Sequence, residues 1–260
     1  MQTSPSRIAL VTGANKGIGL EIAGTLARKG MRVLLGARNP ELGGAAAAQL
    51  REQGLDVQFL ELDLSRPDTL HDAAAWIEKH GEKLDVLVNN AGLERITPMA
   101  TDGDEVERSF ARVVEINIIG TYYVTREAVR SMTAGSSIII TASIWSKSAA
   151  AEFSAYVISK HGNLGFMRVL AKELGPRGIR VNAVCPGWVK TRAALNSLAA
   201  MSGRQGVSQD EMLDEIIRAQ ALPGLMEPAD VTSLYLFLAS DLARNITGQA
   251  VNVDRGEVMA

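Results

Sequence analysis

The chain has 260 residues, of which 47% are hydrophobic and 22% charged, and its formal net charge is −2. This composition predicts one soluble domain over residues 1–260 with a large apolar core. A near-neutral chain without a basic run excludes nucleic acid and membrane as expected partners, and no apolar stretch approaches the roughly eighteen residues of a membrane span. The single cysteine, Cys185, cannot form an internal disulfide, which favours a cytoplasmic location.

Short apolar runs alternate with longer segments of helical periodicity along the chain. The runs predicted as strands are residues 8–12, 32–36, 57–61, 86–89, 137–141, 180–185 and 250–253. The segments predicted as helices are residues 18–29, 67–80, 105–132, 154–174 and 229–240. The strand runs are nearly all apolar, as expected for strands buried on both faces of a parallel sheet. We therefore predict an α/β fold, a single doubly wound Rossmann domain with about seven mostly parallel strands and helices on both faces.

Residues 192–226 depart from this alternation. They are rich in Ala, Leu and Met, and Gly203 and Gly206 interrupt them. An insertion of this size predicts a substrate lid, and a pair of surface helices that only pack is the alternative. The apolar residues that would form a pocket wall are Leu195, Leu198, Met201, Met212, Leu213 and Ile216.

The first predicted strand runs directly into a glycine-rich turn at residues 12–19. Glycines let the backbone approach a pyrophosphate, and the free N–H groups of the following helix favour an anion. The spacing G-x-x-x-G-x-G differs from the common dinucleotide fingerprint G-x-G-x-x-G, and three glycines alone can mark a tight turn. The position after the first strand favours a dinucleotide site. Its expected contacts are Gly13, Asn15, Lys16, Gly17, Ile18 and Gly19.

The end of the second predicted strand bears on the choice of cofactor. A dinucleotide site usually has an acid there to bind the ribose hydroxyls, but residues 34–39 contain none. Arg38 is instead the type of group that pairs with a 2′-phosphate, and Lys16 adds a second positive charge. Both could also be solvated surface cations. The missing acid favours NADP(H) over NAD(H).

Tyr156 and Lys160 are four residues apart in a predicted helix, so both side chains lie on one face. A phenol ionises near 10, and a neighbouring ammonium group lowers that pKa toward a useful range. Ser143 follows a strand run, which puts its hydroxyl at the edge of the sheet where ligands bind. The Tyr-x-x-x-Lys pair alone would indicate only a helix surface. Behind a glycine-rich first turn and a serine at a strand end, it predicts catalysis.

These motifs, in this order, resemble the short-chain dehydrogenase/reductase family over nearly the whole chain. The matching pieces are residues 12–19, residues 89–92, Asn117, Ser143, Tyr156 with Lys160, and residues 186–191. The resemblance implies that Tyr156 is the general acid or base and that Lys160 binds the nicotinamide ribose. It also implies that Asn117 holds a water in a proton relay. Further cofactor contacts implied in this way are Asp63, Leu64, Asn90, Ala91, Gly92, Pro186, Gly187, Val189 and Thr191.

The resemblance implies a homotetramer that uses the helices at 105–132 and 154–174. Trp145 and Trp188 flank the expected site, where each could contact substrate or simply pack. The segment Leu93-Glu94-Arg95-Ile96 carries two charges where apolar residues are expected, which fits either polar substrate contacts or a solvated loop. No spacing of His, Cys, Asp and Glu predicts a metal site.

We expect an NADP(H)-dependent oxidoreductase that interconverts a ketone or aldehyde and an alcohol. Its partner is then a small carbonyl or alcohol substrate, for which sugars, hydroxy acids, steroids and acyl thioesters all remain open. An NAD-dependent alcohol, sugar or hydroxy-acid dehydrogenase is the alternative. A rival from another class is an NADP(H)-binding regulator without turnover, which would have lost Ser143, Tyr156 or Lys160, and none of these is lost.

Overall fold

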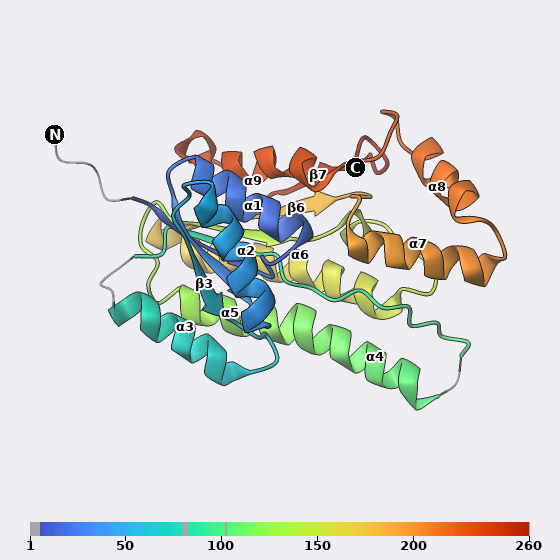
Figure 1. Cartoon of the computed structure of the whole chain (residues 1–260), viewed down its shortest axis with the longest axis horizontal. Helices are drawn as coiled ribbons and strands as arrows, with labels where there is room; N and C mark the ends of the chain where they lie inside the picture. The colour runs from blue at the N-terminus through green and yellow to red at the C-terminus, as the bar shows by residue number, and fades with distance from the viewer. Residues whose placement is uncertain (1–5, 80–82, 102, 260) are drawn as a thin grey trace.

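Seven parallel strands form one sheet at the centre of the computed structural model, which describes residues 6–79, 83–101 and 103–259 (Figure 1). The strands are β1 Ile8–Thr12, β2 Arg32–Ala37, β3 Val57–Glu61, β4 Val86–Asn89, β5 Ser137–Thr141, β6 Arg180–Pro186 and β7 Ala250–Val253. Their order is β3-β2-β1-β4-β5-β6-β7, and every neighbouring pair is parallel. The predicted doubly wound α/β fold is confirmed.

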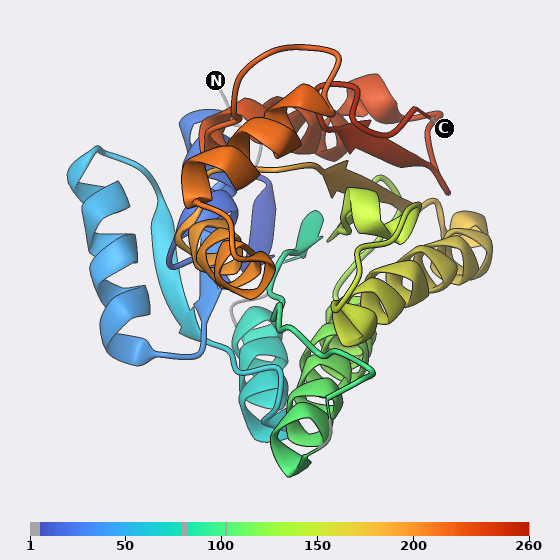
Figure 2. The ribbon, with the colours of Figure 1, turned by 90° about the vertical axis from the view of Figure 1, so that its right-hand side faces the viewer.

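Helices cover both faces of the sheet. On one face lie α1 Gly17–Arg28, α2 Pro40–Glu52 and α9 Thr232–Ala239, whereas the other face carries α3 Pro67–Lys79, α5 Thr121–Ala128 and α6 Ser154–Leu174. Preceding α5 are α4 Asp104–Val114 and a π-helical turn, η1 Glu115–Gly120. Two further helices, α7 Arg192–Gln205 and α8 Gln209–Arg218, lie at the end of the molecule toward which β6 points, the end seen in Figure 2. The short 3₁₀ helices are η2 Ile144–Ser146, η3 Gly175–Arg177, η4 Pro228–Val231 and η5 Asp241–Ala243.

Alternation along each strand divides the apolar residues between two cores. In β1, Ala9 and Val11 join the core under α1, α2 and α9, whereas Ile8 and Leu10 join the core under α3, α5 and α6. Successive side chains of a strand point to opposite faces, so a strand between two helical layers must be apolar at every position. This explains the unbroken apolar runs.

The predicted helices differ from the observed ones at several places. The predicted helix 105–132 is divided into α4, the π-turn η1 and α5, and it ends at Ala128. The predicted helix 229–240 begins as the 3₁₀ turn η4 before α9. His80, the predicted end of the helix at 67–80, lies outside the described residues.

Helix α2 was not predicted, because Gly43, Gly44 and a run of four alanines carry no apolar periodicity. Tertiary packing explains the helix and one of these glycines. The Asn39 side chain caps α2 by accepting from Leu42 N–H at 2.8 Å, and a Cβ at Gly43 would lie 2.2 Å from the Phe59 ring. Gly43 therefore lets α2 lie close to β3.

A second close approach leads to a test. Gly120→Ala is expected to lower the free energy of unfolding by about 1–3 kcal/mol, because the new Cβ would lie 2.6 Å from Leu64 Cβ. Chemical denaturation followed by circular dichroism measures this. Gly165 of α6 is the matched control, since a Cβ there meets nothing within 4 Å. Gly165→Ala is expected to raise the same free energy by about 0.5–1 kcal/mol, and equal effects would contradict the packing of the π-turn on Leu64.

Candidate active site

Many of the predicted site residues follow the carboxyl ends of four neighbouring strands. The turns after β1, β4, β5 and β6 carry Gly13, Asn90, Ser143 and Gly187 respectively. Strands β1 and β4 are neighbours although β2 and β3 separate them in sequence. The strand order reverses there, which opens the crevice where ligands of doubly wound folds bind.

The turns after β1 and β4 are packed directly on each other. The Thr12 hydroxyl accepts hydrogen bonds from the N–H groups of Asn90 and Ala91, at 3.0 and 2.9 Å, and Asn90 Nδ2 donates to Thr12 O at 3.0 Å. A Cβ at Gly13, whose φ is 64°, would lie 2.8 Å from Ala91 Cα, and one at Gly19 would lie 2.5 Å from Asn90 Nδ2. Close approach therefore requires both glycines, and at Gly13 the positive φ requires glycine as well.

The N-terminus of α1 has the features of an anion site. Lys16 is its N-cap but makes no side-chain capping bond, and the first turn contains no acid. The first helical bond runs from Leu20 N–H to Lys16 O, so the preceding N–H groups have no helical acceptor. A Cβ at Gly17 would lie 3.4 Å from Thr191 Cγ2, so the turns after β1 and β6 face each other here. These residues fit the pyrophosphate of a dinucleotide.

Arg38 and Asp63 lie beyond β2 and β3. Arg38 is exposed, directly before the N-terminus of α2. Burial acts to raise the pKa of Asp63, but hydrogen bonds from Ser65 and the charges of Arg112 and Arg38 outweigh it and hold that pKa below its usual value. Arg38 therefore lies close enough to Asp63 to act on its charge, at the rim where an adenosine ribose would bind. Leu64 is buried against the π-turn.

Tyr156 and Lys160 lie on one face of α6, with Lys160 Nζ 5.4 Å from the centre of the Tyr156 ring. Lys160 is buried and donates a hydrogen bond to Thr141 O at 2.8 Å, which ties it to the end of β5. Ser143 starts the turn after β5, and its hydroxyl accepts from Trp145 N–H at 3.2 Å. The structure thus brings together Ser143, Tyr156 and Lys160, three of the four residues predicted as catalytic.

The expected lowering of the pKa of Tyr156 by Lys160 is not found. Burial, and after it the negative charge of Glu94, raise that pKa well above its usual value, although a hydrogen bond with Ser143 opposes them. Burial also lowers the pKa of Lys160 to about 8, against the charge of Glu94. The phenol is therefore protonated at neutral pH, and burial together with the charge of Glu94 strengthens that preference.

Asn117 lies in the π-turn and joins three segments. Its Oδ1 accepts from Leu93 N–H at 2.7 Å, and its Nδ2 donates to Leu93 O at 2.9 Å and to Ser159 Oγ at 3.0 Å. π-Turns within helices are frequent at functional sites. The side chain therefore clamps the backbone after β4 to α6, a positioning role that the sequence did not indicate. The predicted relay water stays a prediction.

The two tryptophans take different positions. Trp145 packs edge-on to Tyr156, with ring centres 5.9 Å apart, and its predicted contact with substrate stays a prediction. Trp188 packs against the small apolar core between α7 and α8, which also holds Leu198, Met201, Met212, Leu213 and Ile216. These predicted pocket-wall residues pack mainly on one another, and Leu195 is 43% exposed.

Two contacts between α7 and the rest of the site were missed from the sequence. Ser197 Oγ donates a hydrogen bond to Glu94 Oε1, and Arg204 Nε donates to Glu152 Oε2 at 2.7 Å. Glu94 had a sequence signal, a charge in a segment expected to be apolar, but Ser197 had none. A serine in a helix carries no pattern that identifies its partner.

Two searches cover only the part of the chain that the structure describes. Within residues 6–79, 83–101 and 103–259, no helix is long and apolar enough to cross a bilayer. Those residues also hold no group of three or more His, Cys, Asp and Glu side chains arranged for a metal ion.

Comparison with known proteins identifies the family. The family model described as enoyl-(acyl carrier protein) reductase matches residues 13–257. The chain belongs to the short-chain dehydrogenase/reductase family. It is therefore an oxidoreductase of that family, and the predicted family membership is confirmed.

Relatives and solved structures align with this chain over almost its full length. A putative ketoacyl reductase of Streptomyces coelicolor is 36% identical over 98% of each chain. A D-beta-hydroxybutyrate dehydrogenase of Cupriavidus necator is 31% identical over 97% of this chain and 98% of its own. A crystal structure of a variant actinorhodin polyketide ketoreductase with NADPH superposes with a TM-score of 0.90, at 34% identity over 99% of both chains.

The lowered pKa of Lys160 predicts how stability changes with pH. Between about pH 8 and pH 10 the unfolded chain binds a proton at this lysine that the folded chain does not, so stability rises with pH. The free energy of unfolding of the wild type, relative to Lys160→Met, is expected to increase by about 2 kcal/mol over this window. Urea denaturation at several pH values measures it. The same substitution at the exposed Lys172 of α6 is the control, and no relative increase would contradict the burial cost.

Proposed function

We propose that the protein is an NADP(H)-dependent oxidoreductase that interconverts a ketone or aldehyde with an alcohol. The observation that carries the proposal is the meeting of Ser143, Tyr156 and Lys160 at the carboxyl end of β5, two strands away from β1 and the uncapped N-terminus of α1. The relatives support the class of reaction, since they include ketoacyl reductases and a hydroxybutyrate dehydrogenase.

The proposed reduction uses the protonated phenol of Tyr156. The Ser143 hydroxyl donates a hydrogen bond to the substrate carbonyl oxygen and stabilises the negative charge that develops on it. Tyr156 transfers its proton to that oxygen, and the alcohol forms. Lys160 holds a proton close to the phenolate left behind, and in oxidation the same steps run in reverse. When bound, the nicotinamide supplies or accepts the hydride at the substrate carbon.

The cofactor preference rests on charge at the rim of the site. We propose that Arg38 and Lys16, both exposed, bind a 2′-phosphate, while the N-terminus of α1 binds the pyrophosphate. Val189 and Thr191 remain the proposed contacts of the nicotinamide. The Thr191 hydroxyl caps α7 by accepting from Ala194 N–H at 3.1 Å and retains its proton as a donor. NADPH in the actinorhodin ketoreductase supports this preference.

The proposal extends to a lid, an assembly and a location. We propose that α7 and α8 form a substrate lid within the single domain, held by Ser197 and Arg204.

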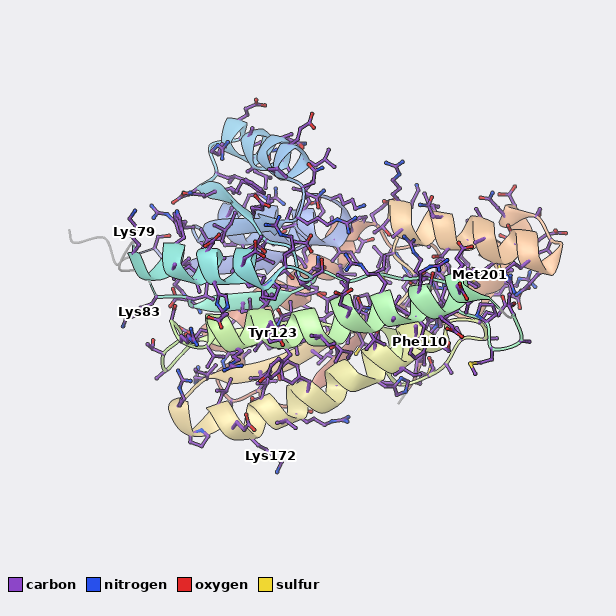
Figure 3. All side chains as sticks on the ribbon, turned by 90° about the horizontal axis from the view of Figure 1, so that it is seen from below. Lys79, Lys83, Phe110, Tyr123, Lys172 and Met201 are labelled. Carbon is purple, nitrogen blue, oxygen red and sulfur yellow. The ribbon has the colours of Figure 1, made fainter. Side chains whose placement is uncertain are left out.

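A homotetramer would cover the outer face of α5 and α6, where η1, α5 and α6 expose apolar side chains (Figure 3, which labels Tyr123). These side chains are Ile119, Tyr122, Tyr123, Ile158 and Val169. Sedimentation of the full chain measures the assembly, and a monomer would contradict it. A cytoplasmic location is supported by the single, buried Cys185.

Tyr156→Phe tests the catalytic assignment. It is expected to lower kcat for carbonyl reduction by at least about 100-fold, because the proton donor is removed, while leaving the Kd for NADPH nearly unchanged. Absorbance of NADPH and its fluorescence on binding measure the two effects. Tyr123→Phe, on exposed α5, is the matched control. An unchanged rate in Tyr156→Phe would contradict the catalytic role of Tyr156, whereas a wild type without turnover would favour the regulator.

Arg38→Gln tests the cofactor assignment. It is expected to lower kcat/KM for NADPH by about 10- to 100-fold relative to NADH, because a charge-assisted contact with the 2′-phosphate is lost. Steady-state kinetics with both donors measure the ratio. Lys172→Gln removes an exposed cation elsewhere and serves as control. A wild-type enzyme that prefers NADH would refute the roles of Arg38 and Lys16.

A further inference from the structure

Glu94 lies on a segment that the protein holds on both sides. Before it, Asn117 binds both the N–H and the C=O of Leu93. After it, Thr97 N–H donates to Glu152 O at 2.6 Å, and Thr97 Oγ1 accepts from Ala155 N–H at 3.0 Å at the start of α6. The carboxyl group is therefore presented from a fixed backbone.

This segment runs beside the catalytic pair. A Cβ at Gly92 would lie 3.6 Å from Lys160 Nζ. Glu94 acts on the charges of both catalytic residues: after burial it is the main cause that raises the pKa of Tyr156, and it opposes the burial that lowers the pKa of Lys160. Burial raises the pKa of Glu94 itself, against Ser197 and Lys160. Its carboxyl group therefore lies close enough to Tyr156 and Lys160 to act on the charges of both.

The carboxyl group of Glu94 has few partners for a partly buried group. In the described parts of the chain, its one hydrogen-bond donor is Ser197 of α7, and no Lys or Arg lies within ion-pair distance. A carboxylate offers about four acceptor positions, and leaving most of them without donors in a partly buried position is unfavourable. A ligand that brings a donor would remove this cost.

We propose that Glu94 determines specificity by accepting a hydrogen bond from a hydroxyl group of the substrate near its reacting carbonyl. The proposal rests on the proposed function and narrows its substrate class to hydroxylated ketones and aldehydes of the sugar or polyol type. A carboxylate at the same place on the substrate is disfavoured, because two negative charges in a partly buried site repel. Glu94 thus separates this site from one for oxo acids.

The test compares substrates that share one carbon frame. The full-length enzyme is assayed with NADPH and 2-butanone, 1-hydroxy-2-butanone, 4-hydroxy-2-butanone and acetoacetate. The wild type is expected to show kcat/KM about 10- to 100-fold higher for at least one hydroxyketone than for 2-butanone, and lowest for acetoacetate. In Glu94→Gln, the ratio of the best hydroxyketone to acetoacetate is expected to fall at least tenfold. Ratios between substrates cancel any effect of Glu94 on Tyr156 and Lys160.

Ser197→Ala is the matched control, because it removes the contact with α7 and keeps the carboxylate. It is expected to preserve the order of substrates. Loss of that order in Ser197→Ala to the same extent as in Glu94→Gln would overturn the proposal and make Glu94 a latch for α7. If Glu94→Gln does not fold, Glu94→Asp replaces it, since this variant shortens the side chain by one methylene. It must then reduce the preference for the hydroxyketones over acetoacetate.

The remaining outcomes separate the two proposals. A wild-type enzyme that reduces carbonyl compounds without preferring the hydroxyketones overturns the specificity role of Glu94 and leaves the proposed function standing. A wild-type enzyme that reduces no carbonyl compound contradicts the proposed function itself.

Discussion

The burial of a fully parallel sheet on both faces is the constraint on which the rest of the structure depends. Parallel neighbours cannot be joined by tight turns, so each strand is followed by a crossover and all carboxyl ends meet at one edge. Where the order reverses between β1 and β4, the following turns would separate, but Thr12 and Asn90 join them by hydrogen bonds. These hydrogen bonds fix the two turns relative to each other at the base of the crevice. Gly13 lets them pack closely, because it has no side chain.

The π-turn connects this framework to the chemistry. It carries Gly120, which packs on Leu64 at the proposed adenosine side, and Asn117, which clamps Leu93 to α6 at the proposed catalytic side. Both contacts arise from one irregular turn in an otherwise regular helix. The π-turn therefore contacts both Leu64, a proposed cofactor contact, and Leu93, which directly precedes Glu94. A regular helix would turn these side chains through a different angle.

Desolvation dominates the electrostatics of the site. Burial is the largest cause of the pKa shift at Tyr156, Lys160 and Glu94, and at each residue it favours the neutral form. A phenol kept neutral suits proton donation to a carbonyl oxygen. Helix α7 contributes to this environment, because Ser197 and Arg204 hold it against carboxylates of the neighbouring segments. Glu94 therefore contacts α7 and also acts on the charges of Tyr156 and Lys160.

The sequence by itself determined the sheet, the family and which residues meet at the candidate site. These depend on local patterns: apolar runs, the spacing of the glycines, and the spacing that puts Tyr156 and Lys160 on one helix face. Tertiary structure decided what depends on contacts between distant segments. It made a helix of the glycine- and alanine-rich residues 40–52 by packing Gly43 on Phe59. It also reversed the expected shift of the Tyr156 pKa, since burial cannot be obtained from residue spacing. The pairing of Glu94 with Ser197 was beyond sequence reasoning for the same reason: nothing local to either residue specifies a partner about a hundred residues away.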